Sequence, residues 1–159
     1  MLAELVAPAH AYAFNNRFLE MLVGDFTPAD WLVLDPVGHD PRWLLGHITS
    51  IRHRLIGMVG LPPVAVGWEA SFLRGTTPKD IPADFNAAEV YRAFQVAGGL
   101  LAERWDTLTT EDLAKPLGRT MPDGSSTIGP AIRFLAWHET YHLGQLGIFR
   151  RLAGKPGAV

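Results

Sequence analysis

Four stretches of this chain repeat apolar residues with the period of an α-helix, and this pattern limits the possible folds more than any other feature. They cover residues 8–23, 41–59, 86–108 and 127–153. Breaks rich in proline and glycine separate them, and no region is convincingly rich in strand-forming residues. Because a helix with one apolar stripe must bury it against other elements, the sequence predicts an all-α four-helix bundle. The length of 159 residues suits one domain, so we expect a single domain over residues 1–159.

Local signals mark where two of these helices begin. Asp40 precedes Pro41, and an aspartate there can accept the free N–H groups of the first turn, while a proline leaves no N–H unpaired. Asn86 and Glu89 resemble a capping box at the start of the third helix. Residues 60–85 form a long connection between the second and third helices, and a loop of this length in a compact domain is often functional.

The composition narrows the classes of partner and of chemistry. The formal net charge is -2, so no strongly basic surface favours nucleic acid. The chain has no cysteine, which excludes thiolate metal sites and a protein thiol nucleophile, so any thiol chemistry needs a thiol cosubstrate. No window approaches about 18 uninterrupted apolar residues, and no targeting segment is evident. We expect a cytoplasmic protein that acts on a small molecule, with no membrane or nucleic-acid partner.

His138 and His142 stand four residues apart in the last predicted helix. Residues at this spacing lie one turn apart on one face, so their imidazoles can bind one metal ion. With Glu139 they also spell H-E-x-x-H, the motif of zinc proteases in which the glutamate is the general base. Such a protease takes its third ligand from further along the chain. No aspartate, glutamate or histidine follows His142, which argues against a protease.

The third ligand must therefore come from upstream, and His47 is the best candidate. It lies between Leu44 and Ile51 on the apolar stripe of the second helix. Neutral imidazoles in a core would each leave polar atoms to satisfy, at about 1–3 kcal/mol for each unpaired group. Helices in a bundle pack about 8–10 Å apart, so side chains of facing helices can share one ion. We predict a divalent-metal site of His47, His138 and His142; the alternative is that each is a hydrogen-bonded core residue.

The other three histidines are weaker candidates for ligands. His53 lies six residues after His47, which directs it to another side of the helix. His10 and His39 lie near helix starts and are expected at the surface or as capping residues. None of the three is predicted to join the metal site.

Two further residues near the ligands are candidates for a catalytic role. Glu139 lies about 100° from the ligand face, and we interpret it as a solvated surface charge, with a role as base or in support of a ligand left open. Gln145 lies two turns after His138, on the ligand face. It is expected either to hydrogen-bond a ligand or water near the metal or to pack in the core. Trp43, one turn before His47, either walls the pocket or packs in the core.

These residues resemble a known family. Gly46-His47 in an apolar second helix, followed by His138-x-x-x-His142-x-Gly144-Gln145 in an apolar last helix, is similar to the DinB-like (DinB/YfiT) superfamily. The resemblance implies a four-helix bundle of up-down-down-up order and a nickel or zinc ion held by the three histidines. It also implies a homodimer. Members with an assigned reaction are thiol S-transferases or thiol-dependent isomerases.

Three imidazoles leave positions open on the ion, as in catalytic rather than structural sites. A bound ion favours the deprotonated form of a water or thiol. Our leading hypothesis is activation of a low-molecular-weight thiol for S-transfer to an electrophilic small molecule. The alternatives are a metal-dependent hydrolase that activates water and a non-catalytic metal- or ligand-binding stress module. All three hypotheses use the same candidate residues, so the sequence does not separate them.

Overall fold

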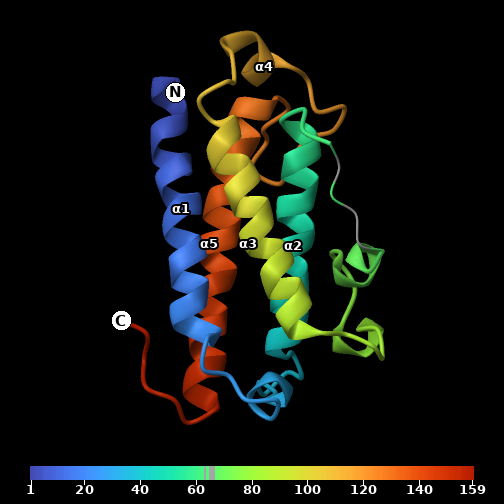
Figure 1. Cartoon of the computed structure of the whole chain (residues 1–159). Helices are drawn as coiled ribbons and strands as arrows, with labels where there is room; N and C mark the ends of the chain where they lie inside the picture. The colour runs from blue at the N-terminus through green and yellow to red at the C-terminus, as the bar shows by residue number, and fades with distance from the viewer. Residues whose placement is uncertain (63, 65–66) are drawn as a thin grey trace.

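The computed structural model describes residues 1–62, 64 and 67–159. Four long helices pack side by side along one axis (Figure 1): α1 (Ala3–Val23), α2 (Pro41–Met58), α3 (Ala87–Arg104) and α5 (Ile128–Leu152). The shorter elements are η1 (Asp30–Leu32), η2 (Glu69–Phe72), η3 (Pro78–Asp80) and α4 (Thr110–Ala114). Among these described residues, extended pairing is limited to an isolated bridge between Pro116 and Thr127. The predicted all-α four-helix bundle is confirmed.

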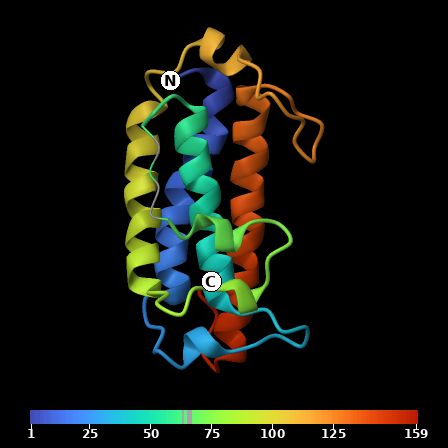
Figure 2. The ribbon, with the colours of Figure 1, turned by 90° about the vertical axis from the view of Figure 1, so that its right-hand side faces the viewer.

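The helices follow the up-down-down-up order that the resemblance implied. In Figures 1 and 2, α1 and α5 run in one direction along the axis and α2 and α3 in the other. Because α2 and α3 are parallel, the chain must return along the bundle between them, and the described residues of 59–86 belong to this crossover. The helix η2 lies within the crossover and packs against α2. The topology therefore requires a long connection between α2 and α3, independently of the function that we expect for it.

The predicted helix starts are confirmed at α2 and α3. The Asp40 carboxylate accepts a hydrogen bond from the Trp43 amide at 3.0 Å, directly ahead of Pro41. The side chain of Asn86 caps α3 in the same way.

The start of α1 was predicted wrongly. It begins at Ala3 and continues through Pro8, where the prediction placed its first turn. Leu5 is buried in the core at 1% exposure, and this packing outweighs the hydrogen bond that Pro8 cannot make.

The apolar core consists of two clusters that follow one another along the bundle. One includes Tyr12, Leu55 and Ile132, and the other includes Ile48 and Leu146. Buried polar side chains of α1, α2 and α5 occupy the sequence positions between the clusters, namely Asn15, Arg52 and Glu139. These three side chains form a polar layer between the two apolar clusters.

The polar layer is built on an ion pair between Arg52 of α2 and Glu139 of α5. The two side chains are 1% and 2% exposed. The guanidinium donates from Nε to Oε2 of Glu139 at 2.5 Å and from Nη2 to Oε1 at 2.7 Å. Asn15 of α1 donates from Nδ2 to the same Oε1 at 2.8 Å. Burial makes these charge-assisted bonds strong and makes the loss of either charged partner costly.

The same guanidinium also contacts α3. Arg52 Nη1 donates to the Phe94 carbonyl at 3.1 Å and to Asn16 Oδ1, and the guanidinium carbon lies 3.5 Å from the centre of the Phe94 ring. Gly98 provides the space, because a Cβ there would lie within 2.7 Å of atoms of Asn16 and Arg52. One side chain therefore links all four long helices.

Our interpretation of Glu139 as a solvated surface charge is wrong. The helical period placed its side chain correctly about 100° from His138. However, α5 packs against both α1 and α2, so this direction points into the bundle instead of into solvent.

None of the described helices is long and apolar enough to cross a membrane.

The Arg52–Glu139 pair gives a stability prediction. Glu139→Leu leaves Arg52 as an unpaired buried cation, so we expect the free energy of unfolding to fall by about 3–5 kcal/mol. The double variant Arg52→Met/Glu139→Leu should lose clearly less, because it removes both charges. Urea denaturation followed by circular dichroism measures both values.

An exposed ion pair provides the control. Arg133 and Glu4 lie 3.3 Å apart with both side chains about half exposed, so Glu4→Leu should cost at most about 1 kcal/mol. Equal losses for the single and double variants at Arg52 and Glu139 would contradict the role assigned to the buried pair.

Candidate metal centre

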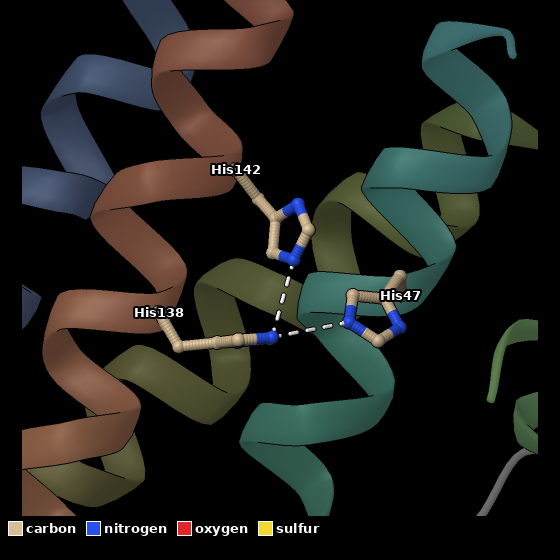
Figure 3. A group of neighbouring side chains, drawn as sticks. All are labelled: His47, His138 and His142. Carbon is tan, nitrogen blue, oxygen red and sulfur yellow. Dashed lines mark hydrogen bonds between the residues drawn. The ribbon is translucent and has the colours of Figure 1, made fainter. Parts of the chain in front are cut away.

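Three imidazoles from two helices converge on one point. His47 comes from α2, and His138 and His142 come from consecutive turns of α5 (Figure 3). The Nε2 atom of His138 lies 3.4 Å from Nε2 of His47 and 3.1 Å from Nε2 of His142. The three ligand atoms all lie within 4.8 Å of one another. Two nitrogens about 2.0–2.1 Å from one ion would be about 3.0–3.4 Å apart, so both separations suit ligands of a shared ion.

The crossover and α2 together orient His47. Its Nδ1 lies 2.7 Å from the carbonyl oxygen of Phe72; a carbonyl only accepts, so Nδ1 carries the proton and Nε2 presents its lone pair. Phe72 can approach because Gly46 lacks a side chain: a Cβ there would lie 2.4 Å from the Phe72 ring. The Trp43 ring stacks on the His47 ring, with the two ring centres 4.8 Å apart and the planes nearly parallel.

Gln145 orients His142. Its Oε1 lies 2.6 Å from Nδ1 of His142, so Nδ1 donates and Nε2 again presents its lone pair. The expectation that Gln145 lies on the ligand face is confirmed, and its partner is the imidazole itself. Such bonds from outer residues fix the orientation of metal-binding histidines in known sites.

Hydrogen bonding alone leaves this cluster unsatisfied. His47 and His142 both direct an Nε2 lone pair towards Nε2 of His138, whose single proton can serve only one of them well. Nδ1 of His138 is buried and has no hydrogen-bond partner among the described residues. The alternative of three hydrogen-bonded core histidines therefore leaves one Nε2 lone pair without a donor, at a cost, whereas the partnerless Nδ1 of His138 is common to both cases. One cation would satisfy all three Nε2 lone pairs, so the donor set fits a divalent ion.

The electrostatics of the cluster keep the imidazoles neutral. Burial, reinforced by the neighbouring imidazoles, lowers the pKa of His138 to about 4. Burial likewise lowers the pKa of His142 to about 4, and it lowers the pKa of His47. At neutral pH all three are therefore in the deprotonated form that metal binding requires.

The remaining histidines lie outside the cluster, as predicted. His53 is buried, with Nδ1 3.1 Å from a carboxylate oxygen of Glu69. His10 is exposed on α1. His39 is also exposed, and its Nδ1 lies 3.0 Å from the Asp35 carboxylate.

Two cavities reach the histidine cluster. The first, which we call the aromatic cavity, has a volume of about 260 Å³, and its walls include Trp43, Tyr141, His142 and the paired Asp35 and His39. The second has a volume of about 290 Å³ and reaches His47 and His138. The cluster is therefore accessible to small molecules from two separate spaces.

Sequence reasoning missed two contributors to this site. The Phe72 carbonyl fixes His47, and no sequence signal identifies a backbone acceptor in a long loop. His39 was assigned to the surface, which is correct, but it also lines the aromatic cavity. Its spacing of four residues from Asp35 was the available clue.

Comparison with known proteins places this geometry in a family context. The sequence pattern of the DinB superfamily matches residues 11–146. A solved structure similar to this fold is YfiT from Bacillus subtilis, described as a probable metal-dependent hydrolase with an unusual four-helix bundle topology. It shares 16% sequence identity with a TM-score of 0.70, and the match covers 98% of this chain and 91% of that one. No match was found among curated proteins.

The cluster generates a prediction about metal binding. After incubation with zinc or nickel and desalting, the protein should retain about one ion per chain, and His138→Ala should retain less than about a tenth of that. The metal should also raise the melting temperature of the protein, because it binds only the folded form. Elemental analysis and thermal denaturation measure these effects. The control is His10→Ala, and metal retention by His138→Ala equal to that of the control would contradict the site.

The lowered pKa values give a prediction for the metal-free protein. Their folded-state values, about 4 for His138 and His142, lie below the ordinary value of 6.5. The unfolded chain therefore gains protons first, and stability falls as the pH drops from about 6.5 to about 4. In the variant His138→Gln/His142→Gln, the free energy of unfolding should fall less over this pH range, because the two titrating imidazoles are gone. Urea denaturation at several pH values tests it, and an identical pH dependence in the two proteins would contradict the burial effect.

Proposed function

Since this chain belongs to the DinB superfamily, we propose that it is a metal-dependent enzyme that acts on a small molecule. In this proposal His47, His138 and His142 hold one divalent ion, nickel or zinc, in a single domain over residues 1–159. The observation that carries the proposal is the convergence of the three Nε2 atoms beside two cavities. Three protein ligands leave positions on the ion for a reactant.

The reaction we propose is transfer of a low-molecular-weight thiol to an electrophilic small molecule. When bound, the ion would supply Lewis acidity and favour thiolate over thiol. Two cavities at one cluster suit two reactants, whereas hydrolysis needs only one organic substrate. The thiol must come from outside because the chain has no cysteine.

Residues of the aromatic cavity would assist this reaction. Asp35 accepts the Nδ1 proton of His39 at 3.0 Å, which leaves Nε2 of His39 free to accept a proton from the thiol. Trp43 and Tyr141 supply aromatic surface for the apolar part of a reactant. Gln145 holds His142 through Nδ1, so that Nε2 would be available to bind the ion. Both carboxylate oxygens of Glu139 accept bonds within the polar layer, so we assign it a positioning role instead of a role as base.

Hydrolysis is the second candidate reaction. It is favoured by the likeness to YfiT, which is described as a probable metal-dependent hydrolase. The same three histidines would then serve to activate water. A non-catalytic stress module, in which the metal only joins α2 to α5, is the outcome left if no turnover is found.

We also propose a cytoplasmic homodimer without a nucleic-acid or membrane partner. A reducing compartment suits a thiol cosubstrate. Support for a dimer comes from α5, where Trp137 and Tyr141 are 60% and 53% exposed and stack on each other. Aromatic side chains are enriched at protein–protein interfaces relative to the rest of the surface. Light scattering of the purified protein gives the oligomeric state.

The experiment is a turnover assay of metal-loaded protein with 1-chloro-2,4-dinitrobenzene and 4-nitrophenyl acetate, each with and without cysteine or glutathione. We expect a rate above that of the uncatalysed reaction only when metal-loaded protein and thiol are both present. His47→Ala should abolish it, and His39→Gln should lower kcat by about a hundredfold with the metal content unchanged. Turnover of the ester without thiol would favour hydrolysis. Turnover that survives His47→Ala would contradict a metal enzyme of either kind.

A further inference from the structure

The second cavity carries an unusual set of charges. It is lined by three arginines from three parts of the chain: Arg54 of α2, Arg74 after η2, and Arg119 in the segment between α4 and α5. The same cavity reaches His47 and His138. We call it the arginine cavity. Residues far apart in sequence thus place three cations beside the candidate metal centre.

The three arginines are exposed, and the described residues supply no counter-ion for them. None of them makes a hydrogen bond or ion pair with any residue in the described parts of the chain, and no aspartate or glutamate is among the residues lining the cavity. Five other arginines pair with carboxylates, whereas Arg17, Arg92 and Arg151 likewise have no such partner among the described residues. What distinguishes Arg54, Arg74 and Arg119 is that all three line one cavity beside the histidine cluster, with no carboxylate in its lining.

Arg54 lies seven residues, about two helical turns, after His47 on α2, and both side chains line the arginine cavity. A divalent ion on the histidines would add two further positive charges to this region. Cations gathered in one space repel each other and attract small anions.

The walls between the arginines are apolar. Met58, Leu73 and Phe134 contribute to them, and the volume of about 290 Å³ is near the lower end of the range for small-molecule sites. Guanidinium groups bind carboxylates and phosphates through paired hydrogen bonds. The cavity therefore matches a small molecule that has an apolar part and an anionic end.

We propose that the arginine cavity binds the anionic end of the substrate, a small organic acid, and so directs its reactive part to the histidine cluster. This inference rests on the proposed function, because it names the substrate class for the same centre. The arginines are specificity determinants in this account. They hold the carboxylate while the chemistry takes place at the histidines.

Binding of simple probes tests this directly. Hexanoate combines an apolar stem with a carboxylate, hexanamide is its neutral counterpart, and butyl phosphate tests the other common anion. Each is titrated into metal-free and metal-loaded protein, with chemical shifts in ¹⁵N-labelled protein as the readout. The metal-free titration excludes direct binding of the carboxylate to the ion.

We expect hexanoate to bind both forms and to shift signals of the arginine cavity. Arg54→Gln, Arg74→Gln and Arg119→Gln should each raise its dissociation constant by up to about tenfold, and added salt should weaken binding. Hexanamide should bind more weakly and respond to none of these variants. The matched control is Arg92→Gln, an exposed arginine on α3 outside the cavity, which should bind hexanoate as the unaltered protein does.

Equal binding of hexanoate and hexanamide, or equal binding of hexanoate by the triple variant and the control, would overturn the inference. Tighter binding of butyl phosphate by the same arginines would replace the carboxylate with a phosphate ester as the anionic group. Metal content and turnover of the arginine variants separate this result from the proposed function. Full metal content with no arginine-dependent anion binding refutes the cavity alone, whereas arginine-dependent binding without turnover on any substrate refutes the enzyme.

Discussion

The buried ion pair between Arg52 and Glu139 sets the relative position of the two helices that carry the candidate metal centre. Its charge-assisted bonds have fixed geometry, so a shift of α2 along α5 would break them and leave two charges buried without partners. Glu139 adjoins His138 in sequence, and Arg52 lies little more than one turn after His47. The alignment that satisfies the ion pair is therefore also the one that brings the three Nε2 atoms together.

The polar layer and the histidine cluster follow different electrostatic rules. In the layer, buried charges are compensated by opposite charge, by a hydrogen bond that Asn15 of α1 donates to Glu139 and by one that Arg52 donates to the Phe94 carbonyl of α3. In the cluster, burial keeps the imidazoles neutral, and outer bonds to the Phe72 carbonyl and to Gln145 fix which nitrogen carries the proton. One layer thus supplies register, and the other supplies lone pairs aimed at a common point. Ligand sites need this kind of support to hold their geometry.

Much of this organisation follows from the sequence. The helical period of the apolar residues predicts the long helices, and Asp40 predicts the start of α2. The positions of the histidines on these helices predict that their imidazoles converge. The direction of the helices came from a family resemblance, because periodicity contains no information on topology. Glu139 was wrongly assigned to the surface. The helical period gives the direction of its side chain around the helix axis, but it does not show which other helices pack on that side. The arginine cavity was out of reach, since its three arginines come together only through the crossover and the segment before α5.

The most direct test of the account is X-ray absorption spectroscopy of the zinc- or nickel-loaded protein, which reports the ligands of the ion itself. The account predicts three imidazole nitrogens at about 2.0–2.1 Å, with one of them lost in a His47→Gln variant that keeps some metal. A spectrum with fewer than three imidazoles, or one unchanged by that substitution, would show that the ion is held elsewhere and would contradict the metal centre.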